Sequence, residues 1–139
     1  MRVLVDTNIL LDFLLQREPF FQNAELLFQA IDSGHVVGYV TATTLTDIFY
    51  IARRYTGSLE QARQAISETL TSMVICPVNR AVLESALASG LTDFEDAVQI
   101  ACAVAQELDA VVSRDTGFSN TLISVFTVEE ILRQLEANN

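Results

Sequence analysis

The segment Val3-Leu4-Val5-Asp6 is a short apolar run that ends on an acid. Such a run predicts a short buried strand. Residues 36–40, 74–78 and 110–113 form similar runs, and Ser124–Phe126 is expected to be a short fifth strand. Helical patterns separate these runs and no hairpin turn joins them. The sequence therefore predicts an α/β fold, a three-layer α/β/α sandwich with a central parallel sheet of four to five strands.

Polar residues mark the starts of the predicted helices. A side-chain oxygen at a helix start can accept a hydrogen bond from a free backbone N–H group of the first turn. One helix is expected to begin near Gln22, and glycines 34 and 90 are expected to end two helices. The other expected starts are Thr44, Ser58, Asn79, Thr92 or Asp93, and Thr127.

Length and charge limit the classes of protein. The 139 residues, half of them apolar, predict one domain over 1–139 with a full core. A net charge of −10 argues against nonspecific binding of nucleic acid, although a metal ion could supply positive charge locally. Cys76 and Cys102 are expected to be buried thiols. The apolar run 9–15 is interrupted by Asp12, and we find no signal-peptide pattern, so a cytoplasmic protein is expected.

Several residue types are missing or rare. The chain has no lysine, so its eight basic residues are all arginines, and it has one histidine, His35. A single histidine cannot build a His-rich zinc site, and its place after Gly34 is typical of a surface turn. A phosphate-binding Walker loop requires lysine and is excluded. Carboxylates are therefore the candidate catalytic groups.

Four aspartates stand where predicted strands end or helices begin. Asp6 and Asp115 follow strands, and Asp47 and Asp96 lie in the first turns of predicted helices. The carboxyl ends of parallel strands and the starts of the following helices meet at one edge of the sheet. We therefore expect these aspartates to share a pocket that binds Mg²⁺ or Mn²⁺, because these ions prefer oxygen ligands. A metal-bound water could then hydrolyse a phosphodiester.

Asp96 can be placed more closely than the other acids. It precedes Ile100 by four residues, so it shares the apolar face of its helix. Asp93 lies on the same face and is a candidate fifth member of the pocket. Simpler structural roles remain open for each acid: a capping-box partner of Thr44 for Asp47, an N-cap for Asp93, a bond to Thr92 for Glu95, and a turn for Asp115.

Four segments together resemble one known family. They are Val5-Asp6-Thr7-Asn8, Thr44-Leu45-Thr46-Asp47, Asp93-Phe94-Glu95-Asp96-Ala97, and Ser113-Arg114-Asp115 before Phe118. In order and spacing they resemble the PIN-domain family, which includes the VapC-type ribonuclease toxins of bacterial toxin–antitoxin pairs. The resemblance covers essentially the whole chain.

The resemblance implies a Mg²⁺- or Mn²⁺-dependent endoribonuclease of single-stranded RNA, a homodimer and a small antitoxin partner. Asp6, Asp96 and Asp115 match family acids, and Asn8 matches a residue that supports the site. Asp47 stands where the family usually has Glu, and Gly117 where it often has a further Asp. These departures leave a second hypothesis, a catalytically weak or inactive PIN-like binding or regulatory module.

Two other acid-based folds fit poorly. A phosphoacceptor receiver domain also gathers acids at the strand ends of a parallel sheet, and a haloacid-dehalogenase-like phosphatase begins with an Asp after its first strand. Both need a lysine that this chain lacks. Among the basic residues, Arg53-Arg54 could contact RNA phosphates or an antitoxin, although arginines at a helix end more often serve the helix dipole. Arg17 and Arg114 are further candidates near the predicted site.

Overall fold

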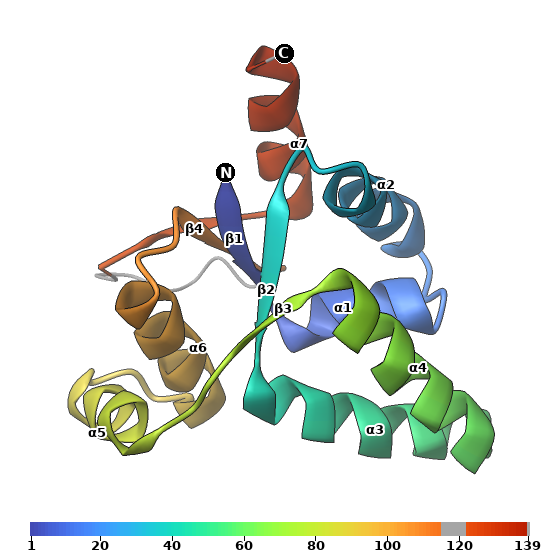
Figure 1. Ribbon diagram of the computed structural model, residues 1–139, viewed down its shortest axis with the longest axis horizontal. Coiled ribbons are helices and arrows are strands. Elements are labelled where there is room, and N and C mark those ends of the chain that lie inside the picture. The colour runs from blue at the N-terminus through green and yellow to red at the C-terminus, as the bar shows by residue number, and fades with distance from the viewer. Residues whose placement is uncertain (115–121, 139) are drawn as a thin grey trace.

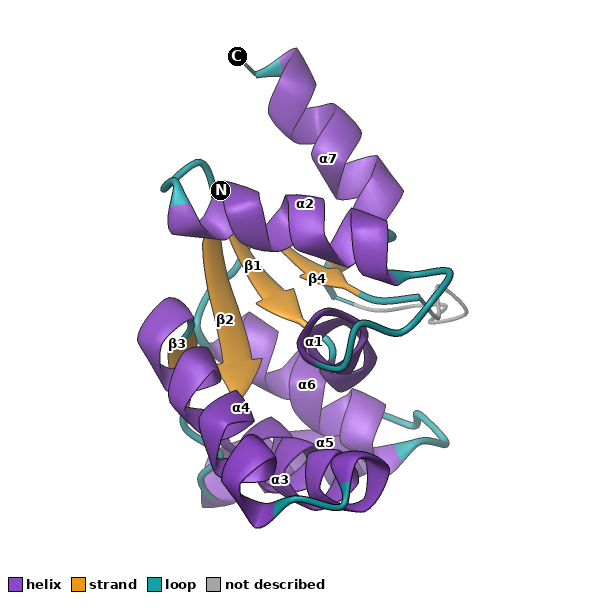
Figure 2. Cartoon of the chain, turned by 90° about the vertical axis from the view of Figure 1, so that its right-hand side faces the viewer, coloured by secondary structure: helices purple, strands orange, loops and turns teal. Residues whose placement is uncertain are grey.

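A five-stranded sheet, parallel throughout, forms the middle layer of the molecule (Figure 1). The computed structural model describes residues 1–114 and 122–138. The strand order is β3-β2-β1-β4-β5, and Figure 2 shows β1, β2 and β4 running in the same direction. The strands are β1 (Arg2–Val5), β2 (Val37–Thr41), β3 (Val74–Cys76), β4 (Ala110–Val112) and β5 (Ser124–Phe126). The predicted fold class is confirmed.

Helices cover both faces of the sheet. Five of them pack on one face: α1 (Thr7–Leu14), α2 (Phe21–Asp32), α3 (Ala42–Thr56), α4 (Leu59–Ser72) and α7 (Val128–Ala137). The other face carries α5 (Arg80–Ala88) and α6 (Phe94–Ala105). Within β1 the side chains alternate, so that Val3 and Val5 enter the first core and Leu4 enters the second. The alternation explains why residues 3–5 of β1 are all apolar.

Most of the predicted helix starts are confirmed. The N-caps Ser58, Asn79 and Asp93 each accept a backbone N–H bond, and Thr127 forms a full capping box with Glu130. Pro77 predicted an edge or strand end, and β3 is an edge strand that stops one residue earlier.

The predicted start of α3 at Thr44 is wrong. Thr41 is the N-cap, and its Oγ1 accepts the Thr44 backbone N–H at 3.2 Å. The helix begins at Ala42, so Asp47 lies in its second turn rather than its first, and it is not the capping partner of Thr44. Strand β2 runs directly into α3, which left no loop residues to mark the boundary in the sequence.

Helix α1 is not among the helices predicted from the sequence. Its buried residues are Thr7, Ile9, Leu10, Leu11 and Asp12, and it packs against α2 and α3. The helix is short, and Asp6 alone separates it from β1, so no loop residues mark the boundary between strand and helix.

The two thiols are buried and unpaired, as expected. Burial raises the pKa of Cys76 to about 11 and that of Cys102 to about 12. Both groups therefore stay protonated and unreactive near neutral pH. His35 lies in an exposed turn, where its Nδ1 is 2.7 Å from Ser33 Oγ. Within the described part of the chain, no helix has the length and apolar character that crossing a membrane requires.

Asp12 is a fully buried acid, 0% exposed, on the inner face of α1. Arg17 holds its Oδ1 through Nη2 at 2.9 Å and Nε at 3.0 Å. Arg114 Nε lies 3.0 Å from Oδ2, an ion-pair contact without a hydrogen bond, and its Nη2 donates to Oδ1 at 3.4 Å. The pairing joins Arg114, the second residue after β4, to α1 and to the turn that follows α1.

We expect the double variant Arg17→Gln/Arg114→Gln to lose about 3–5 kcal/mol of unfolding free energy, because it leaves a buried carboxylate without a counter-charge. Adding Asp12→Asn to that variant should recover part of the loss, since it removes the uncompensated charge. Urea denaturation measures both changes. A triple variant no more stable than the double variant would contradict this account of Asp12.

Candidate functional site

Asp6 stands at the junction of β1 and α1 and is 8% exposed. It occupies the N-cap position of α1, yet its side chain makes no capping hydrogen bond. Instead Oδ1 accepts from Gln99 Nε2 at 2.9 Å and Oδ2 accepts from Ser113 Oγ at 3.1 Å. Its backbone N–H donates to Val112 O at 3.0 Å. This carboxylate therefore connects β1, the end of β4 and α6.

Gln99 is a residue of the candidate site that was not predicted from the sequence. It is 2% exposed on α6, and its amide reaches the Asp6 carboxylate. The available signal was an amide within the apolar run 97–103, because a buried amide requires a hydrogen-bonding partner. The apolar residues of this run predict the inward face of α6, and a polar residue among them is not part of that pattern.

A chain of threonine hydroxyls leads from the end of β2 to α6. Thr41 Oγ1 lies 2.9 Å from Thr44 Oγ1, which lies 2.9 Å from Thr7 Oγ1. Thr7 donates to Glu95 Oε1 at 3.1 Å. Each hydroxyl has one proton to donate, so the last bond sets the direction of the others: Thr41 donates to Thr44, and Thr44 donates to Thr7. The chain fixes the position of the Glu95 carboxyl group.

Glu95 brings an unpredicted carboxyl group to this edge of the sheet. Burial raises the pKa of the Glu95 carboxyl group most, and the negative charge of Asp47 raises it next. The charge of Asp6 and a hydrogen bond to Asp47 also raise this pKa. The hydrogen bond from Thr7 acts the opposite way. The expected bond of Glu95 to Thr92 is thus replaced by a bond to Thr7. The structure brings together Asp6, Asp47 and Glu95.

The other predicted acids lie near this group or outside the described residues. Asp96 follows Glu95 in the first turn of α6, and its backbone N–H donates to Asp93 Oδ1 at 3.0 Å. Asp93 is therefore the N-cap of α6, and it is exposed. Asn8 is exposed in the first turn of α1. Asp115 lies outside the described residues.

The donor set is compatible with a hard divalent cation. In residues 1–114 and 122–138, no group of three or more His, Cys, Asp and Glu side chains is arranged as a formed metal site. The charges of Asp47 and Asp6 nevertheless raise the pKa of Glu95, which shows that the carboxylates repel one another. A cation among them would remove that repulsion. Carboxylate oxygens are the ligands that Mg²⁺ and Mn²⁺ prefer, so the residues fit these ions.

Comparison with protein-family models identifies the family. The model of the PIN domain matches residues 2–117. This chain belongs to the PIN-domain family. None of the curated protein sequences compared with it gives a significant match.

Solved PIN-like structures share the fold at low sequence identity. A toxin–antitoxin complex from Klebsiella pneumoniae is 22% identical, with a TM-score of 0.67 over 91% of this chain and 97% of that one. VapC20 of Mycobacterium tuberculosis, described as a Sarcin-Ricin loop cleaving toxin, is 18% identical, with a TM-score of 0.68 over 84% and 92%. VapBC2 from Rickettsia felis, bound to a DNA fragment from its promoter, is 14% identical, with a TM-score of 0.66 over 91% and 98%.

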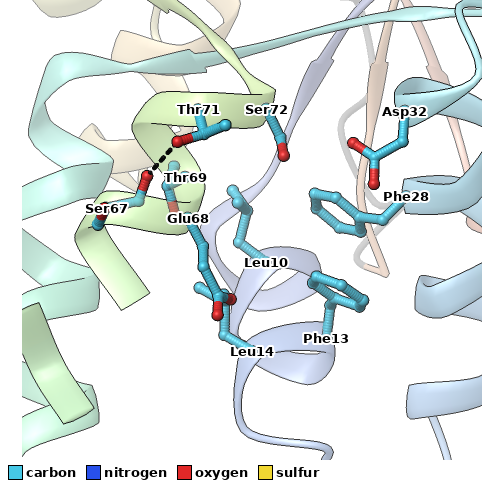
Figure 3. A pocket seen from close by; sticks show the side chains of 10 residues that line it. All are labelled: Leu10, Phe13, Leu14, Phe28, Asp32, Ser67, Glu68, Thr69, Thr71 and Ser72. Atoms are coloured by element: carbon cyan, nitrogen blue, oxygen red, sulfur yellow. Dashed lines mark hydrogen bonds between the residues drawn. The ribbon is translucent and has the colours of Figure 1, made fainter. Parts of the chain in front are cut away.

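A separate pocket of about 390 Å³ lies between α1, α2 and α4 (Figure 3). Its apolar lining is Leu10, Phe13, Leu14 and Phe28. Its polar lining is Asp32, Ser67, Glu68, Thr69, Thr71 and Ser72. The carboxylates of the candidate site do not line this pocket, so the pocket is separate from that site.

We expect Glu95→Gln to raise the melting temperature of the metal-free protein at pH 7. The folded state raises the pKa of Glu95, so its ionised form destabilises the fold above that pKa, and the penalty disappears as the pH falls. The difference between variant and wild type should therefore shrink at about pH 4. Melting in EDTA at both pH values measures it. Glu84→Gln on the exposed surface of α5 is the matched control. A difference independent of pH would show that charge is not its cause.

Proposed function

We propose that this PIN-domain protein is a metal-dependent endoribonuclease that hydrolyses phosphodiester bonds of single-stranded RNA, and that it is the toxin of a toxin–antitoxin pair. The observation that carries the proposal is the buried Asp6 carboxylate, held by Gln99 and Ser113 beside Asp47 and Glu95. The family supports a nuclease, and several solved structures of the same fold are of toxins or toxin–antitoxin complexes.

The proposed ligands of Mg²⁺ or Mn²⁺ are Asp6, Asp47, Asp96 and Asp115, with Glu95 added from the structure. When bound, the ion supplies an activated water and stabilises charge on a phosphoryl oxygen. Gln99 and Ser113 hold the Asp6 carboxylate in position, because both donate hydrogen bonds to its oxygens. We assign Asn8 and Asp93 supporting positions at the start of α1 and α6.

Glu95 offers a way to compensate for the aspartate at position 47, where the family usually has glutamate. Asp47 has a shorter side chain than the glutamate common in the family, so it reaches less far from α3. Glu95 approaches Asp47 from α6 and carries a carboxyl group of the longer type. We infer that Glu95 supplies the reach that Asp47 lacks, which favours a working nuclease over an inactive binding module.

We expect the purified protein to cleave single-stranded RNA in the presence of Mn²⁺, and Asp6→Asn to reduce the rate at least about a hundredfold, since each supporting charge contributes several kcal/mol to a charged transition state. Gel analysis of a labelled RNA measures this, with Glu84→Gln as the control for charge. Equal degradation by the wild type and Asp6→Asn would identify a contaminating nuclease.

Measuring metal binding together with RNA cleavage distinguishes an active nuclease from an inactive binding or regulatory module. Binding to the native state raises the melting temperature, so millimolar Mn²⁺ should stabilise the wild type and have a smaller effect on Asp6→Asn. Stabilisation by Mn²⁺ without any RNA cleavage would favour the binding or regulatory module. No stabilisation would argue against the metal site itself.

The pocket between α1, α2 and α4 is where we propose that the antitoxin docks. The apolar floor of the pocket fits a large apolar side chain of the antitoxin. Asp32 and Glu68 at the rim favour a basic residue of the antitoxin next to that side chain. The proposal also includes a cytoplasmic location and a homodimer. Leu83 and Leu87 on α5 are 40% and 79% exposed and offer apolar area for such contact.

We expect Ser67→Arg to abolish binding of the protein encoded by a small gene that overlaps or directly precedes this one, because the large side chain fills the pocket rim. RNA cleavage should be unchanged. Ser85→Arg on α5 is the control, and co-purification of the two proteins is the measurement. Undiminished binding by Ser67→Arg would exclude this pocket. A gene without such a neighbour would weaken the toxin assignment and leave the nuclease proposal intact.

A further inference from the structure

We propose that Arg17, Arg114 and Phe20 form the surface that holds the RNA strand next to the carboxylates. The two guanidinium groups would bind a backbone phosphate, and the Phe20 ring would stack on a base. The inference rests on the proposed function and addresses its main electrostatic difficulty, which is that a chain of net charge −10 must hold a polyanion.

The charge of this cluster is positive. One buried carboxylate, Asp12, is shared by two guanidinium groups at 2.9 Å and 3.0 Å, which leaves one net positive charge. The side chains of Arg17 and Arg114 are 26% and 35% exposed, whereas that of Asp12 is 1% exposed. The cation therefore faces solvent and the anion does not.

The cluster lies beside the candidate site. Arg114 directly follows Ser113, whose hydroxyl donates to Asp6, and neighbouring Cα atoms are about 3.8 Å apart. Arg17 Nη2 donates to the carbonyl of Asn8 at 3.2 Å, two residues after Asp6. The Arg17 guanidinium thus borders the first turn of α1, and the Arg114 guanidinium contacts Asp12 in the second turn of the same helix. A strand that presents one phosphate to the carboxylates could place a neighbouring phosphate on the arginines.

Phe20 adds an aromatic surface. The guanidinium carbon of Arg114 lies 3.9 Å from the centroid of its ring, and the residue is 40% exposed. Proteins that hold single-stranded nucleic acid combine such rings and guanidinium planes with backbone contacts, because every base can stack on them. The stack also limits the orientations that Arg114 can adopt.

The arginines are held in place before any ligand binds. A flexible surface arginine loses side-chain freedom when it binds a phosphate, which weakens the contact. Here Asp12 and Phe20 already restrict the two side chains. The simpler interpretation is that the arginines serve only as counter-ions for Asp12. That interpretation predicts an effect on stability and none on RNA binding.

The test is the salt dependence of RNA binding. A fluorescent single-stranded RNA is titrated in EDTA, so that it is not cleaved, over a series of NaCl concentrations. Each lost phosphate contact should lower the slope of log K against log salt by about 0.7. We expect Arg17→Gln and Arg114→Gln each to weaken binding and reduce the slope by about this amount. Phe20→Leu should weaken binding about tenfold with the slope unchanged.

Matched variants separate this site from general charge effects. Arg17→Lys and Arg114→Lys keep the charge and should keep the slope. Arg80→Gln removes an arginine on α5 that pairs with the exposed Glu84, and it should change neither affinity nor slope. Melting temperatures identify any variant that does not fold. If Arg114→Gln does not fold, Arg17→Gln carries the same test.

The outcomes distinguish this inference from the proposed function. If the wild type binds and cleaves RNA while both Gln variants bind with its slope, the RNA surface is overturned and the nuclease proposal stands. An equal loss of slope in Arg80→Gln would overturn it as well, since the effect would then be nonspecific. If the wild type binds no single-stranded RNA in EDTA even at low salt, the RNA surface is overturned, and cleavage in Mn²⁺ then tests the nuclease proposal separately.

Discussion

The carboxylate of Asp6 is the constraint on which the rest of the site depends. A buried carboxylate is strongly destabilising unless its oxygens are hydrogen-bonded. Here the donors are Gln99 from α6 and Ser113 from the end of β4, so satisfying one acid fixes the relative positions of three elements. Both donors are neutral, so the negative charge of Asp6 is oriented without being cancelled. It therefore remains available to attract a cation.

Asp12, six residues further along the chain, is stabilised by charged partners rather than by neutral donors. It is also buried, but two arginines pair with it and leave a positive charge at the surface. Helix α1 thus has an uncompensated acid at its start and an overcompensated acid six residues later. In the two proposals, Asp6 helps to hold the metal and the two arginines paired with Asp12 hold the RNA backbone, so that a strongly acidic protein offers opposite charges to the two ligands.

The parallel sheet explains why such a site forms at this edge. Strands β1 and β4 are neighbours, so Asp6 and Ser113 leave the sheet together, and α3 and α6 begin near the same edge. Residues far apart in sequence, such as Thr7, Thr44 and Glu95, are then close enough to form one hydrogen-bonded chain. The repulsion that raises the pKa of Glu95 is the cost of gathering carboxylates there. A bound divalent cation would offset that cost.

The sequence by itself determined the strands, their parallel arrangement and the placing of Asp6 at the end of β1, because short apolar runs and helix caps are local signals. Those signals also gave Asp93 as one of two candidate N-caps, and the structure confirms it. The sequence did not show α1, which only Asp6 separates from β1, nor the start of α3, where strand and helix meet without a loop. Only the tertiary structure decided that Glu95 faces Asp47, that Gln99 reaches Asp6, and that Asp12 holds two arginines. Each of these contacts joins residues from different elements, and the chain order contains no local signal for the distances between them.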